Sequence, residues 1–373
     1  MDLTFPIISA DDHVNPPPLM YGERLPSKWR ARAPRVEEKD GRERLVFEGA
    51  SRPFTALDAA AGVDAKDIRL LARTKQEGRK GGWDPDARIE DMDFDGVHAQ
   101  VLFGSGSGGG VAIQCEDRAL RFAMMQTYND WIAEFCLRYP SRLIGIGEIP
   151  SWDIGLAVAE TDRCAQMGLR GVLLPAVPAY RDSPAEDQPY TSNVYEPLWE
   201  ALAERSMPIH FHLGTRPITR GLDRDVMVNI SVNKSAMSEP LASFILSGAL
   251  QRHPNLKLVS VESGIGWMAF LIPWMDLVWE KHRHHTKSEL IEKPSFYFHR
   301  QVFATFIDDV VGIRNRDIIG VNNILWSSDY PHVNSSWPTS REYIEKHFAD
   351  VPQEEARRMT CKNTAELYGI TLT

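Results

Sequence analysis

The sequence has few cysteines, no long apolar run and no excess of positive charge, and each absence narrows the class of protein. Four cysteines occur in 373 residues, and none of them stand in CxxC spacing. Neither a disulfide scaffold nor a cysteine-based metal site is therefore expected. The formal net charge of -9 argues against nucleic acid or an anionic membrane as the main partner. It leaves a small anionic substrate open, because local arginines can override the global charge.

Segments for export or membrane insertion are also lacking. The first residues, MDLTFPIISADDH, show no basic stretch followed by a long apolar one, so they do not resemble a signal peptide. No apolar run approaches the roughly 20 residues of a transmembrane helix. We therefore expect a cytoplasmic protein with no membrane partner. Its balance of 43% apolar and 25% charged residues is that of a soluble globular chain with a sizeable core.

Short apolar, β-branched stretches alternate with longer amphipathic ones along the chain. This alternation is typical of βα units and a parallel sheet. The expected strands are residues 5–13, 96–104, 142–150, 169–176, 207–214, 256–264, 300–307 and 323–332. The clearest helical patterns are 117–140, 154–168, 195–206 and 264–285. Eight such units predict an α/β fold of the TIM (β/α)8 barrel type, formed by residues 1–373 as one domain. A doubly wound open sheet is the alternative.

Residues 14–88 do not fit this rhythm. They are rich in Pro, Arg, Glu and Gly, and they separate the first strand from its helix by more than a connector needs. An insertion there emerges at the carboxyl end of the barrel strands, where active sites lie. We predict a cap over the site or an oligomerisation arm. For the charged centre, residues 69–82, a solvated loop is an equal alternative.

Polar residues recur where the predicted strands end. Strand one ends in Asp11-Asp12-His13, strand five in His210-Phe211-His212, strand six in Glu262, and strand eight in Asp329 with His332 just beyond. Residues two apart on a strand share a face, so the inward members of these sets should converge at the barrel mouth. Asp12 then faces the other way, as a helix cap or an ion-pair partner.

Aspartate and histidine side chains that converge in this way form a ligand set for a divalent ion. We predict that the inward members of these sets bind zinc, manganese or iron. One ion is expected, and a second is an alternative.

Three further residues are candidates for binding substrate. Arg216 and Arg300 are possible partners of a substrate carboxylate, and Trp267 is a possible wall of an apolar pocket. The GSGSGGG stretch (104–110) lacks the Lys-Ser/Thr of a phosphate-binding loop, and a flexible loop near the site is the better interpretation.

Five stretches, in this order, resemble a known family: ISADDHVNPPP, MPIHFHLG, LVSVESGIGW, PSFYFHRQVFATF and ILWSSDYPH. Over nearly the whole chain the sequence resembles the amidohydrolase-related family of aminocarboxymuconate-semialdehyde decarboxylase and similar metal-dependent hydrolases and decarboxylases. The resemblance implies a barrel with metal ligands at Asp11, His13, His212 and Asp329.

Two positions depart from the family pattern. Asp11 stands where many relatives have histidine, and Glu262 stands where the decarboxylases have a histidine that handles protons. A buried glutamate there can act as a general acid or base if its pKa is raised, or as a further metal ligand.

These features predict a metal-dependent enzyme that acts on a small carboxylated or carbonyl compound. It is a hydrolase of a C–C, C–N or ester bond or a non-oxidative decarboxylase, with Glu262, Asp329 and His332 as catalytic groups. The missing strand-six histidine favours hydrolysis. One alternative is a dinuclear iron or manganese–iron oxygenase, with a second ion on Glu262, His210 and His332. Another is a non-catalytic subunit paired with an active homologue. A homo-oligomer, dimeric or larger, is expected, and a hetero-oligomer with a homologue is the alternative.

Overall fold

The computed structural model describes residues 4–17, 19–104, 115–178, 187–213 and 225–372. The barrel strands follow the predicted positions closely. They are β1 (Ile7–Val14), β5 (Val97–Gly104), β6 (Leu143–Gly145), β7 (Gly147–Glu148), β8 (Val172–Leu174), β9 (Ile209–His212), β10 (Leu258–Val261), β11 (Val302–Phe306) and β12 (Ile324–Trp326). Each pairs in parallel with its neighbours, in the order β1-β5-β6 and β7-β8-β9-β10-β11-β12.

The two runs of strands join at both ends, and this closes the barrel. β6 and β7 are one strand interrupted only by Ile146, whose NH donates to the carbonyl of Leu102 at 3.1 Å. Beyond β12, the NH of Asp329 donates to the carbonyl of Asp11 at 2.9 Å, and the NH of His13 donates to that of Tyr330 at 2.7 Å. Every strand therefore has two neighbours, and the predicted eight-stranded barrel is confirmed.

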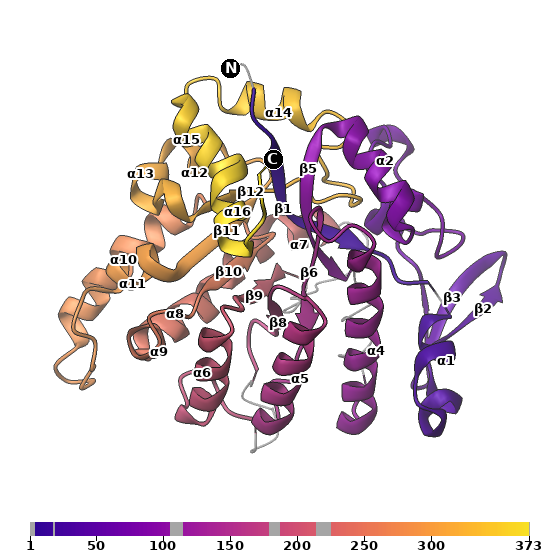
Figure 1. Ribbon diagram of the computed structural model, residues 1–373, viewed down its shortest axis with the longest axis horizontal. Helices are drawn as coiled ribbons and strands as arrows, with labels where there is room; N and C mark the ends of the chain where they lie inside the picture. The colour runs from indigo at the N-terminus through magenta and orange to yellow at the C-terminus, as the bar shows by residue number, and fades with distance from the viewer. Residues whose placement is uncertain (1–3, 18, 105–114, 179–186, 214–224, 373) are drawn as a thin grey trace.

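Helices surround the strands (Figure 1). They are α1 (Met20–Arg24), α2 (Pro85–Asp95), α4 (Arg118–Leu137), α5 (Ile154–Gln166), α6 (Glu196–Glu204), α7 (Asp225–Asn233), α8 (Ser238–Leu246), α9 (Ala249–Arg252), α10 (Met268–His282), α11 (Pro294–Gln301), α12 (Val310–Arg314), α13 (Arg316–Ile319), α14 (Ser340–His347), α15 (Gln353–Arg357) and α16 (Asn363–Tyr368). Asp117 and Asp153 begin α4 and α5 by accepting hydrogen bonds from free backbone NH groups. At the end of the chain, α15 and α16 are separated by a π-turn at Arg358–Lys362.

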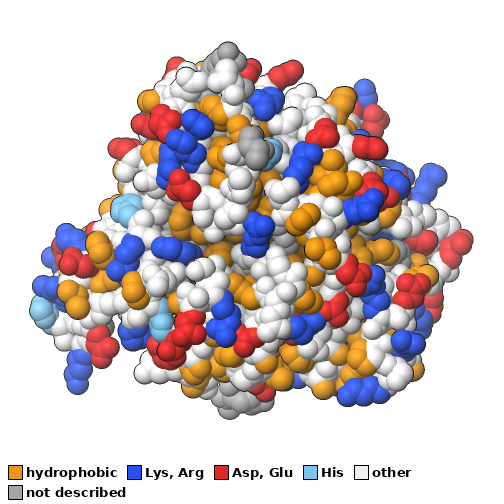
Figure 2. Space-filling model, viewed as in Figure 1, with side chains coloured by type: hydrophobic (Ala, Val, Ile, Leu, Met, Phe, Trp, Pro, Cys, Tyr) orange, Lys and Arg blue, Asp and Glu red, His pale blue; other side chains and the backbone are white. Residues whose placement is uncertain are grey.

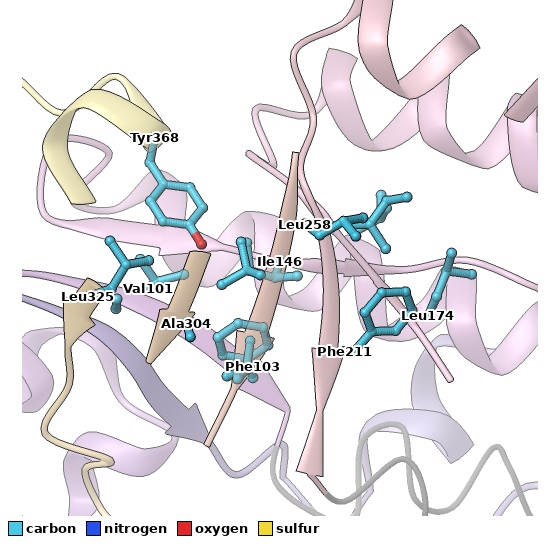
Figure 3. Packing of buried hydrophobic residues seen from close by; sticks show 14 of the residues in the cluster. Val101, Phe103, Ile146, Leu174, Phe211, Leu258, Ala304, Leu325 and Tyr368 are labelled. Carbon is cyan, nitrogen blue, oxygen red and sulfur yellow. The ribbon is translucent and has the colours of Figure 1, made fainter. Parts of the chain in front are cut away.

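Apolar side chains fill the barrel below its carboxyl end (Figure 3). Phe103, Ile146 and Leu325 point into this core from different strands, whereas Leu258 lies beside Phe211 and Leu174 on the outer face of the sheet. Tyr368 of α16 extends toward the same interior, and it is 4% exposed. The polar residues of the strand ends therefore lie above this apolar core, at the carboxyl end of the barrel.

The insertion after β1 has two parts. Its first part is an antiparallel sheet of β2 (Arg35–Lys39), β3 (Arg42–Phe47) and β4 (Ala50–Pro53) at the edge of the molecule beside α1 (Figure 1). Its second part returns to the barrel mouth, where the NH of Ala61 donates to the carbonyl of Pro331 at 3.0 Å. The NH of Val333 donates in turn to the carbonyl of Leu57 at 2.8 Å. The predicted role of residues 14–88 as a cap or an oligomerisation arm remains a prediction.

Charged side chains of both signs are interspersed over the face shown in Figure 2. Some apolar side chains are also exposed, among them Phe270 and Trp274 of α10 and Ile291 in the loop before α11. Among the described helices, none has the length and apolar character needed to cross a bilayer. The expected oligomer stays a prediction.

Arg88 of α2 ties the first and last barrel strands together from a fully buried position. Its guanidinium donates to the side-chain oxygen of Gln100 at 2.6 Å and to the carbonyl of His13 at 2.6 Å. A longer bond of 3.4 Å reaches the carbonyl of Tyr330. Its charge also lies near the buried Asp12: burial raises the pKa of that carboxyl well above its usual value, and Arg88 opposes this rise.

Replacing Arg88 by methionine should therefore destabilise the barrel strongly. The substitution leaves Asp12 without its nearby cation and the carbonyl of His13 without a donor. Each buried acceptor left without its donor costs about 1–3 kcal/mol, and both Gln100 and the carbonyl of His13 lose one. Arg24→Met is the matched control, because Arg24 pairs with Glu134 on the surface at 2.8 Å, where a pair contributes about 0–1 kcal/mol. Denaturant unfolding of both variants tests this, and equal stability would contradict it.

Candidate metal centre

Three side chains from two strands meet at the barrel mouth. Asp11 and His13 lie on β1, two residues apart, and His212 ends β9. The Nε2 atom of His212 is 3.3 Å from Asp11 Oδ1, and the Nε2 atom of His13 is 3.6 Å from the same oxygen. The rings of His13 and His212 meet edge to face at 4.9 Å. Their donor atoms are close enough together to hold one metal ion.

The segment after β12 adds Asp329 and His332. Asp329 Oδ1 lies 3.3 Å from His13 Nε2 and 3.0 Å from His332 Nδ1. The His332 ring stacks on that of His13 at 3.8 Å. These three residues form a second group with metal-ligand spacing, and it shares His13 with the first. The structure thus brings together all four predicted ligands, and His332 lies beside them.

Glu262 approaches from β10. Its Oε2 atom is 3.6 Å from His212 Nδ1. Its backbone has a φ of 57°, and Asp329 has a φ of 59°. Left-handed backbone is uncommon outside glycine, and at strand ends it redirects a side chain. Glu262 is held there by its NH, which donates to Thr305 Oγ1 at 2.8 Å, and by its carbonyl, which accepts from Lys234 Nζ at 3.1 Å.

The cluster holds buried polar atoms without hydrogen-bond partners. Within the described chain these include Asp11 Oδ2, both ring nitrogens of His13 and both carboxylate oxygens of Asp329. Asp11 and Asp329 are 0% exposed. Unpaired buried carboxylates are costly, and a divalent cation is a physical means of compensating them. The mixed imidazole and carboxylate donors fit zinc, manganese or iron.

The charged groups of the cluster change one another's pKa values. Burial lowers the pKa of His13 to about 4, and the neighbouring His332 adds to this. For Asp329, burial raises the pKa, but His332 and His13 outweigh it and the net pKa is well below the usual value. Burial and the charge of Asp329 raise the pKa of Glu262 to about 7. Neutral His13 and ionised Asp329 are the forms that bind metal.

Two strand-end residues lie outside the cluster. His210 has both ring nitrogens engaged, Nδ1 with the carbonyl of Val172 at 3.0 Å and Nε2 with the hydroxyl of Tyr368 at 2.7 Å. It therefore has no ring nitrogen left for the second ion in which we expected it to take part. Strand alternation correctly predicts that His210 points into the barrel. It does not predict how far from the mouth the side chain lies. Asp12 faces away, and its Oδ1 accepts from the NH of Tyr330 at 2.9 Å.

The three residues expected to bind substrate are not brought together in the structure. Arg300 does not reach the site, because it lies in the last turn of α11, just before β11, at the opposite end of the barrel. Its guanidinium donates to the carbonyl of Leu250 at 2.7 Å. Trp267 donates from its indole NH to the carbonyl of Ser263 at 2.9 Å, which holds the loop after Glu262. Arg216 and most of the glycine-rich stretch fall outside the described residues.

The insertion supplies polar residues that the sequence did not single out. Asn15, just beyond His13, donates to the carbonyl of Asp58 at 3.1 Å and accepts from Lys75 Nζ at 3.4 Å. The charge of Asp58 helps to raise the pKa of His332. The second part of the insertion therefore places the charge of Asp58 near His332. The sequence could not have identified these residues, because an isolated lysine in a charged loop has no distinctive pattern. Only their positions in the structure show that they lie near the site.

Comparisons with known proteins identify the family of this chain. The profile of the amidohydrolase family (Amidohydro_2) matches residues 10–370, and the chain belongs to this family. It is 24% identical over 302 residues to the gamma-resorcylate decarboxylase of Rhizobium radiobacter, covering 74% of this chain and 86% of the relative. It is 28% identical over 249 residues to the 2-amino-3-carboxymuconate-6-semialdehyde decarboxylase of Dictyostelium discoideum, covering 64% and 60%. The family expected from the sequence is thus confirmed.

Solved structures share the fold. An amidohydrolase from Mycobacterium avium subsp. paratuberculosis superposes with a TM-score of 0.80 at 21% identity, over 99% of this chain and 100% of its own. A dihydroxybenzoic acid decarboxylase from Polaromonas sp. JS666, with bound manganese and the inhibitor 2-nitroresorcinol, gives a TM-score of 0.64 at 17% identity over 98% of each chain. At these identities the likeness concerns the barrel.

Asp329→Asn should abolish tight metal binding. The substitution keeps the size of the side chain and removes its charge, and weakening a residue that merely supports a ligand already costs about 10–100-fold in affinity. We expect a loss of more than about a hundredfold, measured by titrating metal-free protein with Mn²⁺.

Asp12→Asn is the matched control for this titration. It changes the neighbouring strand-one carboxylate on the opposite face and should keep the wild-type affinity. Equal metal binding by the Asp329→Asn variant and the wild type would contradict the assignment.

Proposed function

We propose that this protein catalyses the metal-dependent, non-oxidative decarboxylation of a small carboxylic acid that carries a hydroxyl or carbonyl oxygen near the carboxylate. The observation that carries the proposal is the buried donor set of Asp11, His13, His212 and Asp329, with its unpartnered oxygens and nitrogens. It occurs in a chain similar to enzymes named as decarboxylases. That similarity outweighs the preference for hydrolysis that the missing strand-six histidine suggested.

The residues present fit a divalent ion, as the unpartnered donor atoms show. When bound, such an ion supplies positive charge that holds the substrate carboxylate and its neighbouring oxygen and stabilises charge that develops there. Two ligands are anionic, Asp11 and Asp329, and two are neutral imidazoles, so the two carboxylates together balance the charge of a divalent ion. We propose one ion, because His210, a ligand expected for a second, is engaged elsewhere.

The reaction itself demands one proton and no oxidant. The bond between the substrate carbon and its carboxylate breaks, carbon dioxide leaves, and the electron pair that remains on carbon takes up a proton. Glu262 is placed to carry this proton, because its carboxyl lies at the edge of the ligand set beside His212. Its pKa of about 7, raised by burial and by Asp329, suits a group that gains and loses a proton near neutrality.

His332 has a different part in this proposal. Its stacking on His13 and its 3.0 Å contact with Asp329 hold two ligands in place. Burial lowers the pKa of His332, but Asp329 outweighs burial and the net pKa is raised to about 10. A protonated imidazolium there would orient Asp329 and attract an anionic substrate.

Glu262→Gln should separate the roles left open for this residue. If Glu262 carries the proton, turnover should fall by about a hundredfold or more, while one metal ion per chain stays bound. Metal content measured together with the rate of product formation tests this. Glu280→Gln, which changes a surface carboxylate of α10 paired with Lys293, is the control and should leave both unchanged. A fall in metal content would make Glu262 a ligand instead, and unchanged turnover would make it structural.

The reaction type is decided by product analysis with the wild type loaded with Mn²⁺. We expect carbon dioxide and the acid-free product from hydroxylated benzoates such as 2,6-dihydroxybenzoate or 5-carboxyvanillate. Cleavage of an ester or amide without release of carbon dioxide would contradict the proposal in favour of a hydrolase. Consumption of dioxygen would favour the oxygenase.

A further inference from the structure

Glu148 ends the third barrel strand, β7, and no role has been given to it so far. Register places it at the mouth. His13 pairs with Phe103 and Leu102 with Gly145, so the partner of His13 on the third strand is Ile146. In a closed eight-stranded barrel the register shifts by about one residue per strand, and alternate strands fill one layer. The third strand is two strands away from that of His13, so the residue in the layer of His13 lies about two residues beyond Ile146. That residue is Glu148.

Counting the register from the third strand to the fifth leads to the same layer. Glu148 pairs with Leu173, and Leu173 pairs with His210, so a shift of about two residues along the fifth strand gives His212. Ile146, two residues before Glu148, points into the barrel core in Figure 3. Alternation then puts Glu148 on the same interior face, nearer the mouth. His13, Glu148 and His212 therefore belong to one layer.

The carboxyl of Glu148 is buried without a partner. The side chain is 4% exposed, and its Oε1 atom accepts and donates no hydrogen bond within the described chain. No described lysine, arginine or histidine forms an ion pair with it. Its charge would bear on the pKa of Tyr21 of α1, Tyr128 of α4 and Cys164 of α5, and none of these three groups is a cation. Burial alone raises the pKa of Glu148 to about 8, so the group is a neutral acid at pH 7.

The backbone of Glu148 is nevertheless fixed. Its NH donates to Asn129 Oδ1 at 2.7 Å, and its carbonyl accepts from Asn129 Nδ2 at 2.8 Å. The side-chain amide of Asn129 thus clamps the strand end to α4. Such a clamp would serve any residue at position 148, and it does not explain the acid. An unpartnered buried carboxyl costs stability, so the fold alone would favour an apolar side chain of similar size.

We propose that Glu148 is a substrate-binding residue that donates a hydrogen bond from its neutral carboxyl to a substrate oxygen at the strand-three side of the mouth. The inference rests on the proposed function, which places the substrate carboxylate at the metal ligands. The oxygen bound by Glu148 belongs to a different substituent of the same small acid, a hydroxyl or carbonyl. Glu148 would then contribute to the choice among differently substituted acids.

The test uses Glu148→Gln and Glu148→Leu in the full-length, Mn²⁺-loaded enzyme. Gln keeps an uncharged donor and Leu removes it. With the hydroxylated benzoate that the wild type decarboxylates, Leu should lower kcat/KM about tenfold, mainly through KM, as expected for one lost hydrogen bond. Gln should stay within about threefold of the wild type. Wild-type kcat/KM in the Leu variant would overturn the proposal, and so would equal losses in both variants.

A stability measurement separates this role from a structural one, and it stays decisive if the wild type decarboxylates none of the acids, an outcome that would count against the proposed function alone. Glu148→Leu should unfold at the same temperature as the wild type or a higher one. Glu160→Leu is the matched control. Glu160 is equally buried but paired, with Arg163 at 2.6 Å and Asn129 at 2.7 Å, so its replacement should destabilise. Destabilisation by Glu148→Leu to the same extent would overturn the proposal.

The pH dependence of unfolding checks the protonation state. Because the folded-state pKa of Glu148 is raised from 4.5 to about 8, its neutral form stabilises the fold fully below about pH 4.5, and this stability is lost as the pH rises through 8. Relative to Glu148→Gln, the wild type should therefore lose stability between about pH 5 and pH 8. A constant difference between the two across this range would show an ionised, paired Glu148 and overturn the proposal.

Discussion

The structure depends on the hydrogen bonds that join β1 to the segment after β12. The same few residues close the barrel and form the metal centre. The NH of Asp329 donates to the carbonyl of Asp11, so the bond that completes the strand circuit also sets the distance between two carboxylates. The reciprocal bond from the NH of His13 to the carbonyl of Tyr330 fixes the imidazole between them. A barrel that failed to close would have no ligand set, and the ligand set can be buried only because the barrel closes.

This coupling carries an electrostatic cost. Asp11 and Asp329 lie at 0% exposure, each near the same imidazole, and like charges in a buried place repel. The backbone strain at Glu262 and Asp329 adds to it, since both have positive φ and such conformations cost of order 1–3 kcal/mol each. Arg88 offsets part of the cost from behind the strands by binding the carbonyl of His13 and by its charge near Asp12. A cation at the mouth offsets the rest. The arrangement is therefore best understood as one that a metal ion completes.

Much of the barrel could be predicted from the sequence, because each buried strand is a short β-branched stretch between longer amphipathic ones. The ligands could be predicted because they end those stretches at period two. Depth could not. His210 and His212 share a face, yet one contacts Tyr368 of the last helix and the other contacts Asp11. Arg300 was misjudged for a related reason: the strand begins two residues later than expected, and a parallel strand's first residue lies at the far end of the barrel from its last.

Glu148 shows what pattern reading omits. In the stretch GIGEIP the glutamate is a single acid with no neighbour that suggests chemistry. Only the register across three strands places it in the layer of His13 and His212. The insertion is difficult for the opposite reason. It contains many charged residues, and the sequence does not show which of them lie near the site. Asn15, two residues beyond His13, binds the carbonyl of Asp58 and the Nζ atom of Lys75. The mouth is thus lined from two sources. The strands supply rigid ligands, and the insertion supplies charges whose positions depend on how it packs against the segment after β12.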